Sequence, residues 1–211
     1  MGIQNDFNLY FKIADTEKEI KTCQSIRYKV YCEERKWLPA DHFPDRLERD
    51  IYDEKSPTFI SLNDDFEIVG LTRIIKGSDY GTLPFLQHPS VKKRQIDVST
   101  MVELSRYIVV SPKHKGLISH GLFRIALHYC KRNKITDYVI LIEPSLRRLI
   151  ERYYWFYEPM CPPAMYYGAF TYPAVCNAGQ IEKTWHNHYP DNYRFYMDES
   201  NVISSVELVK G

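Results

Sequence analysis

The sequence predicts an α/β fold in which a twisted mixed sheet carries helices on both faces. Three observations lead to this prediction: strand patterns open the chain, a strand–helix–strand–helix unit occupies its middle, and further short strands follow. Such elements pack as layers around one apolar core. A chain of 211 residues is long enough for one sizeable core, and we expect a single domain over residues 1–211.

The first half of the chain alternates strand and helix signals. Residues 7–13 place apolar side chains at every second position, which predicts a strand beginning at Phe7. Thr16 and Glu19 form a T-x-x-E capping box that starts a helix. The apolar positions at helical spacing are Ile20, Cys23, Ile26, Val30 and Tyr31. A loop between residues 39 and 57 precedes two strands, which are predicted over 58–62 and 67–75.

The second half begins with a loop-rich stretch over residues 76–100. A strong strand pattern over 102–110 is followed by a loop, a helix near 119–132 and a buried strand over 137–143. Ser145 is expected to cap a helix that ends at about Tyr154. From residue 159 onward, proline and aromatic residues predict short strands.

Composition excludes several classes of partner and site. The chain has 28 basic and 27 acidic residues, so no single-sign field would attract nucleic acid or a membrane. The five cysteines are widely spaced without a CxxC pair, which argues against disulfides and zinc. No apolar run is long enough to span a bilayer, and the amino end lacks a signal-peptide pattern. We therefore expect a cytoplasmic protein without an integral membrane segment.

Three arginines occupy faces where the pattern predicts apolar side chains. Arg27 shares the face of Cys23 and Tyr31 on the first helix, Arg73 lies on the side of Val69, Leu71 and Ile75, and Arg106 falls into line with Val102, Leu104, Ile108 and Val110. A buried guanidinium keeps its charge and requires partners. The loop before residue 58 supplies Glu48, Asp50 and Asp53, so we expect an ion-pair network. The alternative is that the arginines extend to solvent from strand and helix ends.

Glu103 is the remaining charged residue of the central strand. Simple alternation puts it on the face of Met101, Ser105 and Tyr107, and away from Arg106. A bulge in the strand would be needed to bring Glu103 and Arg106 to one site.

These residues stand in an order and spacing that resemble a known group of enzymes. The motifs are Arg27-x-x-x-Tyr31-x5-Trp37, Glu48-x-Asp50-x-x-Asp53, Gly70-x-x-Arg73 and Glu103-Leu-Ser-Arg106. They resemble the acyl-homoserine lactone (autoinducer) synthases of the GNAT-like acyltransferases, which usually have Phe where Tyr31 stands. The amino-acid sequence of residues 26–34, 43–53 and 83–85 more closely resembles that of the long-chain N-acyl amino acid synthases and of the exosortase-associated acyltransferases. The resemblance covers residues 20–110.

The resemblance implies a fold, a donor and an acceptor. It implies a GNAT-like sheet with a V-shaped opening at its central strands and an apolar tunnel lined partly by residues 153–170. It implies an acyl carrier protein as partner, presenting a fatty acyl thioester on phosphopantetheine, and a small-molecule amine as acceptor, with tyrosine as a guess. No other cofactor is implied. The alternatives are a homoserine lactone synthase that uses S-adenosylmethionine and a non-catalytic acyl-binding module.

Each motif residue then receives a candidate role. Aminolysis of a thioester requires a base for the amine, and Glu103 is the first candidate, with Glu48 second. The alternative for Glu103 is that it only pairs with an arginine. Arg73 and Arg106 are expected to orient Glu103 or to bind the acceptor carboxylate. The remaining residues are assigned to the cleft and to substrate binding: Arg27, Tyr31, Trp37, Asp50, Asp53, Ser105 and Tyr107. For Tyr31 and Trp37 the alternative is simple packing.

The segment before the central helix bears on the donor. Coenzyme A-dependent GNAT enzymes have an [RQ]-x-x-G-x-[GA] loop there, whose amides hold the pyrophosphate. Here Gly116 is retained, but Lys113 and Ile118 replace the other residues, which argues for a carrier protein. Basic residues that could meet an acidic carrier protein are Lys113, Lys115, Arg124, Lys131 and Arg132. The histidines do not form a ligand set, so no metal is expected.

Overall fold

The computed structural model describes residues 9–91, 95–111 and 114–197. Its strands form a mixed sheet in the order β1-β2-β3-β4-β5-β8-β6, with β7 paired to β8. The strands are β1 (Tyr10–Ile13), β2 (Thr58–Leu62), β3 (Ile68–Lys76), β4 (Met101–Val109), β5 (Asp137–Ile142), β6 (Glu158–Pro159), β7 (Ala164–Tyr166) and β8 (Ala169–Asn177). The helices are α1 (Glu17–Tyr28), α2 (Gly77–Tyr80), α3 (Lys115–Arg132), α4 (Pro144–Arg152), α5 (Ala178–His188) and α6 (Pro190–Met197).

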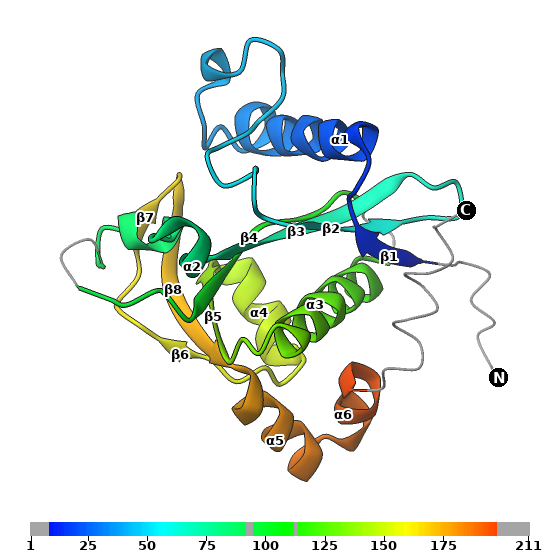
Figure 1. Ribbon diagram of the computed structural model, residues 1–211, viewed down its shortest axis with the longest axis vertical. Helices are drawn as coiled ribbons and strands as arrows, with labels where there is room; N and C mark the ends of the chain where they lie inside the picture. Colours follow the sequence, from blue (N-terminus) through cyan, green and yellow to red (C-terminus); the bar gives the residue numbers. More distant parts are fainter. Residues whose placement is uncertain (1–8, 92–94, 112–113, 198–211) are drawn as a thin grey trace.

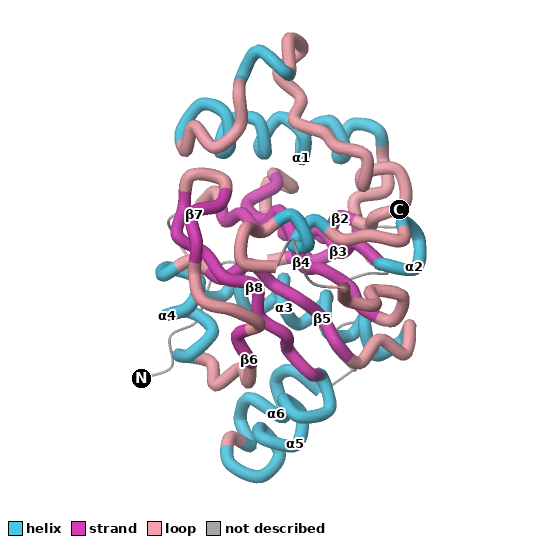
Figure 2. The backbone as a smooth tube through the Cα atoms, turned by 90° about the vertical axis from the view of Figure 1, so that its left-hand side faces the viewer, coloured by secondary structure: helices cyan, strands magenta, loops and turns pink. Residues whose placement is uncertain are grey.

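The helices cover both faces of the sheet, as the sequence predicts. Figures 1 and 2 show α1 on one side and α3 with α4 on the other. On the α1 side, Cys23 and Tyr31 pack against Leu71 and Ile108. On the α3 side, a larger apolar cluster includes Leu122 of α3 and Leu104 of β4. The sheet therefore has two buried faces, which explains why its central strands are apolar on both sides.

Local signals in the sequence define the first helix. Thr16 Oγ1 accepts a hydrogen bond from the backbone N–H of Glu19, and the Glu19 carboxylate accepts one from the N–H of Thr16, so the capping box is confirmed. The helix continues beyond α1 as a π-helical segment, η1 (Lys29–Glu34). This extension brings Tyr31 over the sheet.

Strands β4 and β5 run parallel, but they pair over only four residues each. The pairing runs from Met101 opposite Asp137 to Leu104 opposite Ile140. Beyond this point β4 continues to Val109 and pairs only with β3 on its other side. The two central strands therefore separate, as the predicted V-shaped opening requires.

A β-bulge in β4 changes which side chains share a face. Leu71 pairs with Ile108 and Arg73 pairs with Ser105, so Arg106 and Tyr107 together stand opposite Thr72. Arg106 has a φ of 55°, in the left-handed region. The prediction that Arg106 shares a face with Val102 and Leu104 is thus wrong, because those side chains lie on the α3 side.

Several predicted elements differ from the structure. The N-cap of α4 is Glu143, not Ser145, whose hydroxyl donates instead to the Glu143 carboxylate. The segment after residue 177 forms α5 and α6 rather than strands, because Asn177 caps a helix through the Gln180 N–H. Ile20 is exposed, and Val69 belongs to the α3-side cluster rather than to the face of Arg73. Phe7 lies outside the described residues.

None of the helices in the described ranges combines the length and the apolar character that crossing a membrane would require.

Candidate active site

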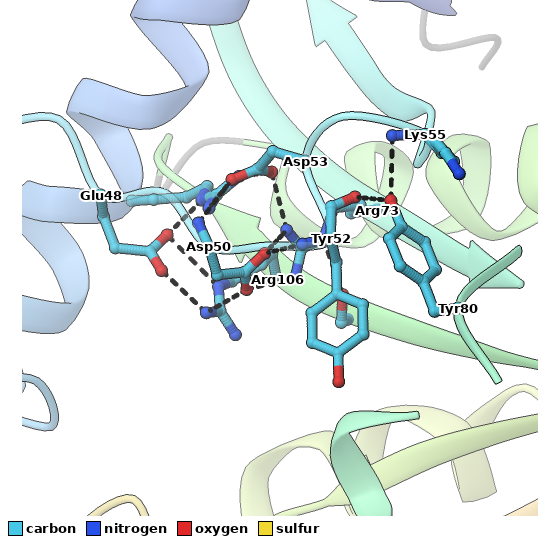
Figure 3. Close-up of polar contacts among 10 residues, drawn as sticks. Glu48, Asp50, Tyr52, Asp53, Lys55, Arg73, Tyr80 and Arg106 are labelled. Carbon is cyan, nitrogen blue, oxygen red and sulfur yellow. Dashed lines mark hydrogen bonds and ion pairs between the residues drawn. The ribbon is translucent and has the colours of Figure 1, made fainter. Parts of the chain in front are cut away.

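Three arginines from three separate elements converge on three carboxylates from one loop, and Figure 3 shows Arg73 and Arg106 pointing toward these carboxylates. The arginines come from α1, β3 and β4, and the carboxylates from the loop before β2. The six residues are Arg27, Arg73, Arg106, Glu48, Asp50 and Asp53. The predicted network is therefore present.

Arg27 joins the helix to the loop. Its Nη1 and Nη2 donate to the two carboxylate oxygens of Asp53 at 2.6 and 2.9 Å, and its Nε donates to Glu48. Only 1% of Arg27 is exposed. The alternative that this arginine extends to solvent is wrong.

Arg73 is the central cation of the network. Its Nη1 donates to Asp50 and Asp53, both at 2.7 Å, and its Nη2 donates to Asp50 at 2.8 Å. Its Nε donates to Ser105 Oγ at 3.2 Å. The residue is fully buried, so most of its donor capacity is used within the fold.

Arg106 is the one arginine of the three that reaches the cleft described below. Its Nη2 donates to Glu48 at 2.7 Å and to Asp50 at 3.0 Å, while 17% of its side chain remains exposed. Its Cζ lies 5.4 Å from the ring centroid of Tyr31, a cation–π distance. Among the described residues no hydrogen bond engages its Nη1, so this group is available to a ligand.

The network is balanced in charge. Burial opposes ionisation of Glu48, but the charges of Arg106 and Arg27 outweigh it and lower the pKa of Glu48. Burial likewise opposes ionisation of Asp53, yet the hydrogen bonds from Arg27 lower its pKa strongly. The pKa of Asp50 is also lowered, against burial, by its bond to Arg73. The three carboxylates are therefore ionised at neutral pH and match the three guanidinium charges.

The loop that carries the carboxylates is anchored at its far end. Tyr80 Oη donates to the backbone oxygen of Tyr52 at 2.7 Å and accepts from the backbone N–H of Lys55 at 2.9 Å (Figure 3). The ring of Tyr80 also packs edge-on against that of Tyr52. No role for Tyr52 or Tyr80 was predicted from the sequence.

Glu103 is buried as deeply as Glu48, and no ion pair joins it to an arginine of the described chain. It accepts a hydrogen bond from the backbone N–H of Phe85 at 2.7 Å. Burial raises the pKa of Glu103 to about 8, against the opposing influence of that hydrogen bond and of Arg73 and Arg106. A carboxyl with a pKa near neutrality in a cleft is suited to accept and return a proton.

A cleft opens where β4 and β5 separate, and Glu103 lines it together with Arg106. Its α3 side is apolar and is formed by Leu104, Tyr107, Phe123, Ile140 and Leu146. Its α1 side is aromatic and polar and is formed by Tyr31, Trp37, Ser105, Tyr166, Tyr167 and Thr171. The cleft thus presents an apolar wall and a polar wall on the two sides of one opening.

The aromatic residues of the α1 side are tightly packed. Tyr31 and Trp37 stack at 5.6 Å between ring centroids. Trp37 also touches the turn between β7 and β8, where a Cβ on Gly168 would lie 2.7 Å from its ring. Gly168 has a φ of +72°, so this turn requires glycine for both backbone and space.

The bulge decides how the predicted residues are grouped. Glu103, Ser105, Arg73 and Arg106 share the α1 side, so the bulge does bring Glu103 and Arg106 to one site. Tyr107 was expected beside them and is not. It stacks on Phe123 at 5.2 Å and its hydroxyl bonds Ser119 Oγ, so it reaches the cleft from the α3 side.

Two contributions were not predicted from the sequence. The motif Leu83-Pro-Phe85 was noted, but the backbone N–H of Phe85 that holds Glu103 was not. Thr171 also faces the cleft, far from every motif. A lone threonine in a terminal strand carries no signal in a single sequence.

Other reactive side chains do not form a second centre within the described ranges. The five cysteines are buried, and no disulfide joins any two of them. No group of three or more His, Cys, Asp or Glu side chains in these ranges is placed to hold a metal.

The residues that replace the coenzyme A loop motif lie just before α3 and in its first turn, and the structure describes only some of them. Lys113 lies outside the described residues. Ile118 is fully buried and packs against Gly70, where a Cβ would meet it at 2.5 Å. Of the basic residues suggested for carrier-protein contact, Arg124 lies over Phe195 and Lys131 pairs with Glu182.

Comparisons with known proteins agree with this geometry. The family profile described as N-acyl amino acid synthase FeeM matches residues 22–179. A search of curated proteins finds no match. Among solved structures, the coenzyme A-dependent acyl-homoserine lactone synthase BjaI with S-adenosylmethionine and isopentyl-CoA has a TM-score of 0.69 at 18% identity, over 87% of this chain and 90% of that one.

Two further structures share the fold. The acyl-homoserine lactone synthase LasI has a TM-score of 0.65 at 15% identity, over 82% of this chain and 90% of that one. FeeM, an N-acyl amino acid synthase from uncultured soil microbes, has a TM-score of 0.61 at 14% identity, over 84% of this chain and 94% of that one. The predicted GNAT-like fold is confirmed.

Proposed function

Since the chain belongs to the FeeM family of N-acyl amino acid synthases, and so to the N-acyltransferases, we propose that it transfers a long-chain fatty acyl group from an acyl carrier protein thioester to the amine of an amino acid. The reaction takes place in the cytoplasm. The observation that carries this proposal is Glu103, a buried carboxyl with its pKa raised to about 8 that lines the cleft beside Arg106.

Glu103 acts as the general base. The amine nitrogen of the acceptor attacks the thioester carbonyl carbon, Glu103 accepts a proton from that nitrogen, and the carbon–sulfur bond breaks. The thiolate of the pantetheine arm leaves and takes up this proton, directly or through water, so that an amide and a free thiol result. Neither a nucleophilic side chain nor a metal is required.

Glu48 is less suited to this role, although it was the second candidate. It accepts hydrogen bonds from Arg27 and Arg106, and its pKa is lowered. A carboxylate held in this way is a weak base, and protonating it would leave two buried guanidinium groups short of a partner. We assign Glu48, Asp50, Asp53 and Arg27 to the scaffold of the cleft, together with Arg73.

Arg106 binds the carboxylate of the acceptor. Its Nη1 is not engaged within the described residues, and part of its side chain is exposed to the cleft. A guanidinium forms a bidentate, charge-assisted pair with a carboxylate. Trp37, Tyr31 and Ser105 then line the acceptor side, while Tyr107 and the apolar α3 side receive the acyl chain.

The separation of β4 from β5 supplies the remaining requirement. The developing oxyanion needs hydrogen-bond donors, and backbone N–H groups on the facing strand edges beyond Leu104 are placed to provide them. Holding both substrates in one cleft also reduces the entropic barrier to their reaction.

The start of α3 bears on the identity of the acyl donor. Ile118 fills space where coenzyme A-dependent GNAT enzymes carry a small residue, which favours a carrier protein. However, BjaI is a coenzyme A-dependent enzyme of the same fold. Acyl-coenzyme A is therefore included as a second donor in the test.

The same fold also accommodates a different product. BjaI and LasI are acyl-homoserine lactone synthases, so a lactone formed from S-adenosylmethionine is the second candidate. The aromatic side of the cleft, with Trp37 stacked on Tyr31, offers apolar surface to either acceptor.

Mass spectrometry of reaction products tests the proposal. Purified protein is supplied with acyl carrier protein or coenzyme A loaded with C8 to C16 chains, an amino acid pool and S-adenosylmethionine. We expect an N-acyl amino acid that disappears in Glu103→Gln. A lactone would favour the second candidate. If the folded protein forms neither product from any donor, the chain is a non-catalytic acyl-binding module.

A further inference from the structure

Thr171 carries a buried hydroxyl that no group among the described residues satisfies. The residue is 8% exposed, and within the described ranges its Oγ1 has no hydrogen-bond partner. It nevertheless lines the cleft. Buried hydroxyls are normally hydrogen-bonded, because leaving one unpaired costs about 1–3 kcal/mol. The free hydroxyl therefore points to a partner that the substrate provides.

The strand register places Thr171 across the opening from Arg106. Tyr172 of β8 pairs with Ile142 of β5, and Ile140 of β5 pairs with Leu104 of β4. Counting along the strands, Thr171 stands roughly level with Arg106. On β8 the side chains of Tyr172, Ala174 and Cys176 face the α3-side cluster. Because side chains alternate along a strand, Thr171 faces the α1 side. Thr171 and Arg106 thus line the same cleft from two different strands.

A buried histidine holds the backbone of Thr171 in place. His88 Nε2 lies 2.9 Å from the carbonyl oxygen of Thr171, and its Nδ1 accepts from the N–H of Ser90. Since a carbonyl only accepts, Nε2 carries the proton in this arrangement. His88 is fully buried and packs against Tyr166, which also lines the cleft. The hydroxyl is therefore mounted on a rigid support.

We propose that Thr171 is a specificity residue that hydrogen-bonds a hydroxyl on the side chain of the acceptor amino acid. This inference rests on the proposed function, in which Arg106 holds the acceptor carboxylate and Glu103 receives the proton of its amine. Thr171 completes a three-point contact from a different strand.

The distance across the cleft selects the kind of hydroxyl. With β5 between β4 and β8, the two contacts lie about two strand spacings apart, roughly 10 Å, and the separation of β4 from β5 widens this. A hydroxyl on Cβ, as in serine, lies too close to its own carboxylate to span that width. A para-hydroxyl on an aromatic ring is long enough, and Trp37 and Tyr166 supply aromatic walls.

The test compares tyrosine with phenylalanine as competing acceptors. In Thr171→Val, which keeps the side-chain shape, we expect the ratio of kcat/KM for tyrosine over phenylalanine to fall at least tenfold. The fall should come from tyrosine, with phenylalanine unchanged or improved, because a site built to bond a hydroxyl discriminates against its absence. Thr171→Ser should keep most of the ratio.

Thr72→Val is the matched control. Thr72 also lines the cleft, but its hydroxyl already donates to the backbone oxygen of Ser105 at 3.3 Å. The tyrosine-to-phenylalanine ratio should therefore stay within about threefold of the wild-type value. Thermal unfolding of each variant shows whether it is folded, and if Thr171→Val is not, Thr171→Ala with the same ratio readout takes its place.

Three outcomes separate the possibilities. If wild-type protein makes N-acyl amino acids but Thr171→Val keeps the wild-type ratio, the role of Thr171 is refuted and the proposed function stands. If the variant instead alters the preference between 3-hydroxyacyl and plain acyl donors, the hydroxyl contacts the acyl chain and the inference is wrong. If wild-type protein forms no such product, the proposed function itself fails.

Discussion

Replacing Glu103 by glutamine separates catalysis from stability. Glutamine keeps an oxygen that accepts the 2.7 Å hydrogen bond from the Phe85 N–H, but it cannot take a proton from the acceptor amine. Loss of a general base lowers the rate by about 10²–10⁴. We therefore expect kcat/KM to fall by this factor in Glu103→Gln while the fold is retained.

The same substitution should increase stability. The pKa of Glu103 is raised to about 8 from an ordinary 4.5. Because the pKa of Glu103 is higher in the folded protein than in the unfolded chain, the fold is most stable below pH 4.5, where this carboxyl is protonated in both states. The free energy of unfolding then falls by about 1.4 kcal/mol per pH unit as pH rises toward 8. Glutamine does not ionise, so at pH 7 Glu103→Gln should be more stable than wild type by about 3 kcal/mol.

Two assays check these numbers. The thiol released from the acyl donor reports the rate, and the five buried cysteines keep the background low. Wild-type kcat/KM should rise with pH until about pH 8, and this limb should be absent in Glu103→Gln, while the ionisation of the acceptor amine affects both proteins. Urea unfolding at pH 7 reports the stability. A variant that keeps activity within threefold, or that is several kcal/mol less stable, would refute the assignment of Glu103 as the base.

Four further substitutions test the network, the acceptor contact and the packing. Asp53→Asn removes the partner of Arg27 and Arg73 and should lower the free energy of unfolding by about 3–5 kcal/mol in urea at pH 7. Because the pKa of Asp53 is lowered, the difference in free energy of unfolding between wild type and Asp53→Asn should shrink only as pH falls below about 4. A difference at pH 3 equal to that at pH 7 would contradict the ion pairs. Arg106→Lys should raise KM at least tenfold for an amino acid but leave it unchanged for an amine without a carboxylate; an equal effect on both would exclude the carboxylate contact. Gly77→Ala places a Cβ 1.9 Å from the Val98 carbonyl oxygen and should cost about 3 kcal/mol or more by thermal unfolding, whereas Gly81→Ala, which meets nothing within 4 Å, should cost only about 1–2 kcal/mol from its positive φ. Equal costs for the two glycine substitutions would contradict the clash.

The sequence predicted the layers of this fold well because the relevant signals are local. The capping box at Thr16, the strands predicted over 58–62 and 137–143 and the helix ending at Arg132 follow from residues within one element, and β5 ends one residue before the predicted end. The helices α5 and α6 were missed because the aromatic-rich segment before them does form the strands β7 and β8, and the aromatic composition continues beyond these strands. Asn177, which caps α5, was the available helix signal. A single domain over residues 1–211 stays a prediction.

The site was predictable in composition but not in arrangement. Charged residues on apolar faces identified Arg27, Arg73 and Arg106 and their carboxylate partners, because burying a guanidinium requires such partners. The pairing scheme was not predictable, since it depends on contacts between segments far apart in the chain, such as Arg106 with Glu48. Thr171 was missed for the same reason: only the register of β8 brings it to the cleft.

The bulge at Arg106 links the scaffold to the chemistry. A non-glycine residue with a φ of 55° costs about 1–2 kcal/mol, and the three hydrogen bonds of Arg106 to Glu48 and Asp50 offset this cost. With regular alternation, Arg106 would point into the apolar α3 side and its ion pairs could not form. With the bulge, the network neutralises itself and leaves Glu103 as the one buried carboxylate without a counter-charge in the described structure. The same backbone irregularity therefore brings Arg106 to the acceptor and keeps the Glu103 pKa in the range that a general base requires.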